Sequence, residues 1–136
     1  MSESREITLP SLIESVDEAA QLADDFAKSC GFSDDLISAV DLAIRESVAN
    51  AVKHGNKFDE TKNVEIKFAD VDGGFEITVR DHGTGFAITD IPDPTNPENL
   101  LKANGRGILF MNSFMDEVNW ENHPGGGMVV KMLKRR

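Results

Sequence analysis

The sequence has no apolar run long enough to cross a membrane, and only one of its 136 residues is a cysteine. A transmembrane helix needs about 20 consecutive, mostly apolar residues, and no segment approaches that length. Cys30 cannot form a disulfide within the chain, and its place before Gly31 at the end of a helical pattern indicates a half-buried structural thiol. The start of the chain lacks the basic and then apolar order of a secretory signal. Together these absences predict a protein of the reducing cytoplasm.

Basic residues are also in short supply. Lys and Arg number 14 against 24 Asp and Glu, which gives a formal net charge of −10. A nucleic acid or an anionic membrane attracts a concentrated positive patch, so direct binding to either is not expected. The acidic balance suits a basic partner, or a nucleotide that arrives with its own cation. Hydrophobic residues make up 40%, which is ordinary for a globular protein, and the length fits one domain.

Several familiar ligand-binding motifs are missing as well. No Cys and His spacing suggests zinc. There is no G-x-x-x-x-G-K-[ST] phosphate loop, and the G-T-G at residues 83–85 lacks the third glycine and the downstream acid of a dinucleotide-binding fingerprint. The partner Lys and the H-R-D segment that accompany the glycine-rich loop of protein kinases are absent too. A nucleotide site in this chain must therefore follow another pattern.

Helical spacing of apolar residues predicts two helices in the first half of the chain. The first ends at about Ser29 and begins at a cap provided by Ser11 or Ser15. The second covers about 34–54. Ser33 is its expected N-cap, and two aspartates follow in the first turn, where the helix dipole favours carboxylates.

Alternating polar and apolar residues predict the strands. Segment 5–10 alternates weakly and ends at a proline, which indicates an edge strand. Segments 64–70 and 74–81 flank an Asp-Gly pair and form the strongest hairpin signal, and 116–122 with 128–134 predict a second hairpin. This order of elements predicts the α+β class: a two-layer sandwich in which a mixed, mostly antiparallel sheet carries the helices on one face.

Regular patterning is lost between Phe86 and Gly105, where three prolines and several Asp and Asn residues predict a long loop. A loop of that length inside a compact domain is more often functional than not. A short helix is expected to follow over 107–114.

The second helix places two oxygen-bearing side chains one turn apart. Glu46 and Asn50 share a face with His54, while the apolar residues of the helix point elsewhere. Mg²⁺ prefers oxygen ligands and shares phosphate oxygens with a bound nucleotide, so Asn50 could bind the ion and leave Glu46 free to handle a proton. The same spacing also fits an ordinary solvated helix face, which is the simpler interpretation of the pair taken alone. His54 likewise suits a helix C-terminus.

Two glycine clusters add to this pair. Gly83 and Gly85 follow a predicted strand, and Gly105 and Gly107 open a predicted helix. Glycine lets a ligand approach the main chain closely, and free N–H groups at a helix start attract phosphate. Asp81, at the end of the strand, can accept a hydrogen bond from the exocyclic amine of adenine, although a turn cap is its simpler role when it is taken alone.

Three segments, taken in order, resemble one superfamily. E-x-x-x-N-A-x-x-H-G spans Glu46–Gly55, D-x-G-x-G-F spans Asp81–Phe86, and G-R-G-I spans Gly105–Ile108. Their order within one chain of 136 residues closely resembles the GHKL (histidine-kinase-like) ATPases, and most of all the branch of anti-sigma factors and serine-protein kinases. The resemblance implies a Bergerat-type ATP-binding fold in a single domain over residues 1–136, with an ATP lid at 86–104.

The resemblance also implies roles for the matched residues. Glu46 would act as general base or orient the acceptor hydroxyl, Asn50 would bind Mg²⁺, and Asp81 would hold the adenine amine. Such a site suits phosphoryl transfer, which depends on positioning and charge neutralisation more than on covalent chemistry. The further cofactor-binding positions are Gly83, Gly85, Phe86, Gly105, Arg106, Gly107 and Ile108. Lys53 is added to them because Lys53 and Arg106 are the nearest candidate cations.

Two functions are consistent with this resemblance. The first is an ATP-binding anti-sigma regulatory factor with Mg²⁺-dependent serine/threonine-protein kinase activity toward a small antagonist protein. Its partners would be a sigma factor, an anti-anti-sigma antagonist or both, in a possible homodimer. The alternative is a nucleotide-gated protein-binding switch with little or no phosphotransfer, which the scarcity of cations in the lid segment supports, since only Lys102 precedes Arg106.

Overall fold

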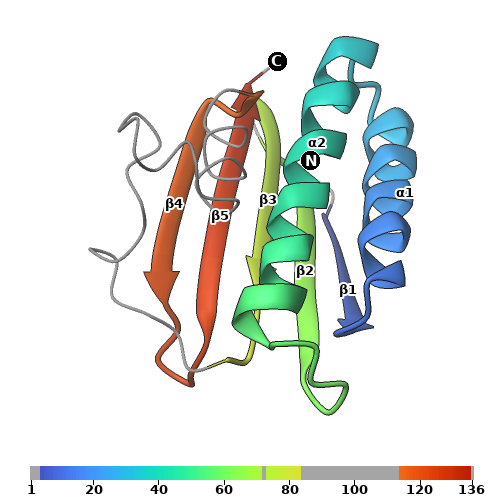
Figure 1. The fold of residues 1–136 in the computed structure, drawn as a ribbon. Helices are drawn as coiled ribbons and strands as arrows, with labels where there is room; N and C mark the ends of the chain where they lie inside the picture. Colours follow the sequence, from blue (N-terminus) through green and yellow to red (C-terminus); the bar gives the residue numbers. More distant parts are fainter. Residues whose placement is uncertain (1–3, 72, 84–113, 136) are drawn as a thin grey trace, which may run out of the picture.

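A five-stranded sheet with two helices on one face forms the described part of the molecule (Figure 1). The computed structural model describes residues 4–71, 73–83 and 114–135. The elements are β1 (Ser4–Pro10), α1 (Glu14–Ser29), α2 (Asp34–Asn50), the π-helical turn η1 (Ala51–Gly55), β2 (Asn63–Val71), β3 (Gly74–Arg80), β4 (Glu117–Asn122) and β5 (Met128–Arg135). The predicted two-layer α+β sandwich is therefore confirmed.

Strand order in the sheet is β1-β2-β3-β5-β4. Every pairing recorded among the described residues is antiparallel, so the expected sheet is antiparallel rather than mixed over these strands. Both predicted hairpins are confirmed, and β1 lies at an edge as its proline suggested. Because β5 returns between β3 and β4, the start of β5 lies beside the end of β3.

The core fills the space between the helices and the inner face of the sheet. Four phenylalanine rings join the two layers: Phe26 of α1 and Phe32 pack edge-on against Phe75 of β3, and Phe68 of β2 completes the group. Burying a phenylalanine side chain contributes about 1.5–3 kcal/mol, so this group stabilises the attachment of α1 to the sheet. Within the described residues, no helix is long and apolar enough to span a membrane.

The two helices begin differently. Ser33 caps α2 as predicted, because its hydroxyl accepts a hydrogen bond from the Leu36 N–H at 3.2 Å. The capping prediction for α1 is wrong: Ile13 occupies the N-cap and makes no side-chain cap bond. Ser15 instead donates its hydroxyl to the carbonyl of Pro10 at 2.7 Å, and Ser11 donates to the carbonyl of Lys62. These buried serines satisfy the carbonyl at the end of β1 and the carbonyl of the residue just before β2.

The predicted helix over 34–54 changes its geometry near its end. Regular α-helix stops at Asn50, and η1 continues to Gly55 with a wider turn. The Asn56 N–H closes this turn by donating to the carbonyl of Ala51 at 2.8 Å, five residues back. Single π-turns of this kind are frequent at functional sites.

Candidate functional site

The described candidate residues gather where the end of α2, the end of β3 and the β4–β5 turn meet, at the lower end of the sheet in Figure 1. Asp81 directly follows β3 and is 6% exposed. A Cβ added to Gly55, at the end of η1, would lie 2.2 Å from Oδ2 of Asp81. The first and second sequence motifs, 26 residues apart in the chain, are therefore in direct contact.

The carboxylate of Asp81 is held on one side. Its Oδ1 accepts hydrogen bonds from the Gly83 N–H at 3.0 Å and from the Met128 N–H at 3.1 Å. The main chain of Asp81 also donates to the carbonyl of Met128 at 3.0 Å. No described residue donates a hydrogen bond to Oδ2. One oxygen thus caps the turn, as the simpler interpretation of Asp81 required, while the other has no hydrogen-bond donor among the described residues.

Three glycines allow the main chain to close around this carboxylate. A Cβ at Gly83 would lie 2.0 Å from the carbonyl oxygen of Gly55, and a Cβ at Gly127 would lie 2.0 Å from the carbonyl oxygen of Asp81. Gly127 also has a φ of +87°, which favours glycine. These contacts leave no room for a side chain at either position. Gly127 was not predicted as a site residue, because the His-Pro-Gly-Gly-Gly run indicates only a turn when it is read alone.

Glu46 and Asn50 lie on the last turns of α2, and both are half-buried. Neither side chain makes a hydrogen bond or an ion pair with another described residue. Lys53 is exposed on η1 and could approach an anionic group from outside. His54 is also exposed, and the wider π-turn removes it from regular α-helical spacing above Asn50.

A resident metal cluster made by the protein alone is not found in the described ranges: no group of three or more His, Cys, Asp or Glu is placed to hold an ion. An amide oxygen beside a carboxylate is nevertheless the donor set that suits Mg²⁺ when phosphate and water supply the other ligands. The residues present therefore fit a cation that is brought in with a nucleotide.

The remaining predicted site positions lie outside the described residues. They are Gly85, Phe86, Gly105, Arg106, Gly107 and Ile108, together with the lid predicted over 86–104.

His82, between Asp81 and Gly83, directs its ring Nε2 to within 3.0 Å of Oε2 of Glu65 on β2.

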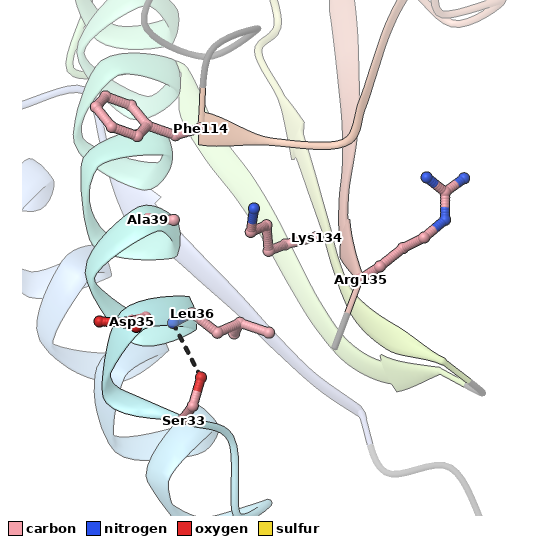
Figure 2. A pocket seen from close by; sticks show the side chains of 7 residues that line it. All are labelled: Ser33, Asp35, Leu36, Ala39, Phe114, Lys134 and Arg135. Atoms are coloured by element: carbon pink, nitrogen blue, oxygen red, sulfur yellow. Dashed lines mark hydrogen bonds between the residues drawn. The ribbon is translucent and has the colours of Figure 1, made fainter.

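A separate cavity of about 290 Å³ lies at the other end of α2 (Figure 2). Leu36 extends from α2 toward the strands and Lys134 extends from β5 toward the helix, whereas Arg135 extends away (Figure 2). The lining residues are Ser33, Asp35, Leu36, Ala39, Phe114, Lys134 and Arg135. Since Glu46 and Asn50 lie at the opposite end of the helix, this cavity is distinct from the candidate site.

Comparison with known proteins identifies the family of this chain. The sequence profile of the histidine kinase-like ATPase domain matches residues 9–134. The chain therefore belongs to the histidine kinase-like ATPase domain family, and a nucleotide is the ligand that this family membership indicates for the site.

Two relatives with assigned names are similar to this chain over most of its length. The chain is 34% identical over 114 residues to the serine-protein kinase RsbW of Bacillus licheniformis, a match that covers 79% of this chain and 70% of the relative. It is 36% identical over 104 residues to the anti-sigma F factor of Geobacillus thermodenitrificans, which covers 74% of this chain and 70% of the relative.

A solved structure supports the fold. The crystal structure of the RsbU and RsbW domains of a Mycobacterium tuberculosis protein superposes with a TM-score of 0.72 at 21% identity. The match covers 98% of this chain and 32% of the solved chain, so this chain spans about a third of that structure.

Proposed function

We propose that this chain is an ATP-binding anti-sigma regulatory factor that phosphorylates a serine or threonine of a small antagonist protein. The observation that carries the proposal is the Asp81 carboxylate, which has one oxygen fixed by two main-chain N–H groups and the other free of described donors. The names of the relatives, serine-protein kinase and anti-sigma F factor, support the reaction and the class of partner.

Recognition of the nucleotide base would begin at Asp81. Oδ2, the carboxylate oxygen that neither main-chain N–H holds, would accept a hydrogen bond from the exocyclic amine of adenine but would repel the carbonyl that guanine has at the same position. Gly55 and Gly83 keep the main chain close to this carboxylate, so the base would lie against the backbone rather than against side chains.

Phosphate chemistry would take place at the last turns of α2. Asn50 would provide one oxygen ligand to Mg²⁺, which neutralises charge on the phosphates when bound. Glu46, one turn earlier on the same helix, would accept the proton of the attacking hydroxyl or orient that hydroxyl. Lys53, exposed on η1, would add positive charge near the phosphates.

The partners would be proteins. The relatives' names point to a sigma factor, and phosphorylation of a serine or threonine requires an acceptor protein, here a small antagonist of the anti-sigma activity. A net charge of −10 fits this class of partner better than it fits nucleic acid.

The kinase assignment is tested by substitution of Glu46. Incubation of the wild-type chain with ATP, Mg²⁺ and its cognate antagonist should give a phosphoprotein, and Glu46→Gln should lower the rate at least about 100-fold, because a positioned acid or base typically contributes that much. Glu18→Gln, on the exposed face of α1, removes one carboxylate from the other helix and should keep the wild-type rate.

Full activity of the Glu46→Gln variant would contradict the role of Glu46. If the wild-type chain binds ATP but transfers no phosphate to any antagonist, the function is instead that of a nucleotide-gated protein-binding switch.

A further inference from the structure

A buried asparagine stands directly beside the candidate base-binding turn. Asn56 follows η1, lies one residue beyond the E-x-x-x-N-A-x-x-H-G segment, and is only 1% exposed. Its Oδ1 accepts a hydrogen bond from the main-chain N–H of His82 at 2.8 Å. Its Nδ2 donates to Oγ of Ser11 at 2.8 Å and to the carbonyl of Asn63 at 3.0 Å.

These partners come from three separate parts of the chain. His82 follows β3, Ser11 follows β1, and Asn63 begins β2. Ser11 is itself fully buried and donates its hydroxyl to the carbonyl of Lys62. Every polar atom of the Asn56 side chain is therefore paired, and a buried network of this kind holds one orientation because any other would leave a buried group without a partner.

The hydrogen bond to His82 fixes the segment that carries the candidate base-binding carboxylate. His82 lies between Asp81 and Gly83, and the Gly83 N–H donates to Oδ1 of Asp81. Met128 holds Asp81 from the β5 side, and Asn56 holds the next residue from the side of α2. The 81–83 turn is thus tied on two sides.

We propose that Asn56 is a positioning residue for nucleotide recognition, an inference that rests on the proposed ATP-binding function. It orients the Asp81 carboxylate toward the base by holding the His82 N–H, without touching the ligand itself. A merely structural asparagine would change the stability of the chain, whereas a positioning asparagine changes the affinity and base preference of the folded protein.

Two variants separate these roles. Asn56→Leu removes the acceptor that holds His82, while Ser11→Ala disturbs the same buried network and leaves the Asn56–His82 bond in place. Affinities for ATP and GTP are measured by calorimetry with Mg²⁺, at a temperature well below the unfolding transition of each variant.

Asn56→Leu should weaken ATP binding about tenfold and reduce the preference for ATP over GTP, as expected when one directional contact is lost. Ser11→Ala should lower the melting temperature yet keep the ATP affinity within about twofold of wild type. Equal ATP affinity in wild type and Asn56→Leu, or equal losses in both variants, would overturn the proposal.

Hydrogen exchange on the wild-type chain tests the same inference if Asn56→Leu does not fold. ATP should slow exchange of the His82 amide together with that of Met128, because both amides hold the turn that the base contacts. Unchanged exchange at His82 on saturation with ATP overturns the role of Asn56 alone. A wild-type chain that binds no ATP at all would overturn the proposed function, and this inference with it.

Discussion

At the scale of single residues, the candidate site depends on how closely main-chain segments approach one carboxylate. Gly55, Gly83 and Gly127 come from three different segments, and a Cβ on any of them would overlap an atom of Asp81 or of Gly55. Glycine at these positions is thus a requirement of packing.

Gly55→Ala tests this requirement. The added methyl group would lie 2.2 Å from Oδ2 of Asp81, so the carboxylate must rotate or move. We expect ATP affinity to fall by at least about tenfold, measured by calorimetry, because the oxygen proposed to contact the base is displaced.

Gly31→Ala is the matched control for this substitution. Gly31 has a φ of +79° and open space around it, so an alanine there strains the backbone without a clash and far from the site. It should lower the melting temperature while ATP affinity stays at the wild-type value. Normal ATP affinity in Gly55→Ala would contradict the assignment of Oδ2 to the base.

At the scale of elements, the contact between α1 and α2 carries two neighbouring carboxyl groups. Burial, a hydrogen bond to Asp41 and the charge of Asp41 raise the pKa of Asp24 to about 6, against opposing effects of Lys28 and Arg45. Oδ1 of Asp24 is buried and has no hydrogen-bond partner among the described residues. The guanidinium group of Arg45 forms its ion pairs with Asp41 and Asp17 and not with Asp24.

The raised pKa makes the stability of this helix pair depend on pH. Because the folded-state pKa of about 6 exceeds the ordinary value of 3.8, the contribution of Asp24 is fully present below pH 3.8 and is lost as the pH rises through about 6. Asp24→Asn keeps a polar group that cannot ionise. At pH 7.5 it should raise the free energy of unfolding by on the order of 1 kcal/mol, after allowance for solvent screening.

Urea unfolding at several pH values measures this effect. The difference between Asp24→Asn and wild type should shrink as the pH falls from 7.5 toward 4. Asp25→Asn, at the exposed neighbouring position, should show no such trend. A difference that stays constant over this range would mean that Asp24 does not titrate near pH 6.

At the scale of the whole molecule, the site is assembled from both halves of the chain. The turn that starts β5 supplies Gly127 and the Met128 N–H to a carboxylate 47 residues earlier. A ligand bound at this junction would connect α2, β3 and β5, and its binding free energy would add to the stability of the entire fold.

Thermal unfolding with and without nucleotide tests this connection. ATP with Mg²⁺ at 100 times its Kd should add about 2.7 kcal/mol to stability, a rise of several degrees in Tm. EDTA should remove most of this gain if the ion joins Asn50 to the phosphates, and Asn50→Ala should show little dependence on Mg²⁺. An unchanged Tm with ATP would contradict the nucleotide site.

The sequence by itself determined the elements and the family. Period-two alternation located β2 and β3 and the β4–β5 hairpin, because each strand has one face on the core. Ser33 was identified as a cap because that bond spans only three residues. The order of three short motifs indicated the ATPase family, which the family comparison confirmed over residues 9–134.

Only the tertiary structure decided which distant segments meet at the candidate site. The pairing of β3 with β5 brings Gly127 against Asp81, and Asn56 reaches His82 across 26 residues. The π-turn after Asn50 and the use of Ser11 away from the α1 cap also depend on neighbours distant in the chain. Local periodicity reports which face of an element is buried, whereas these contacts depend on which elements become neighbours after the sheet has formed.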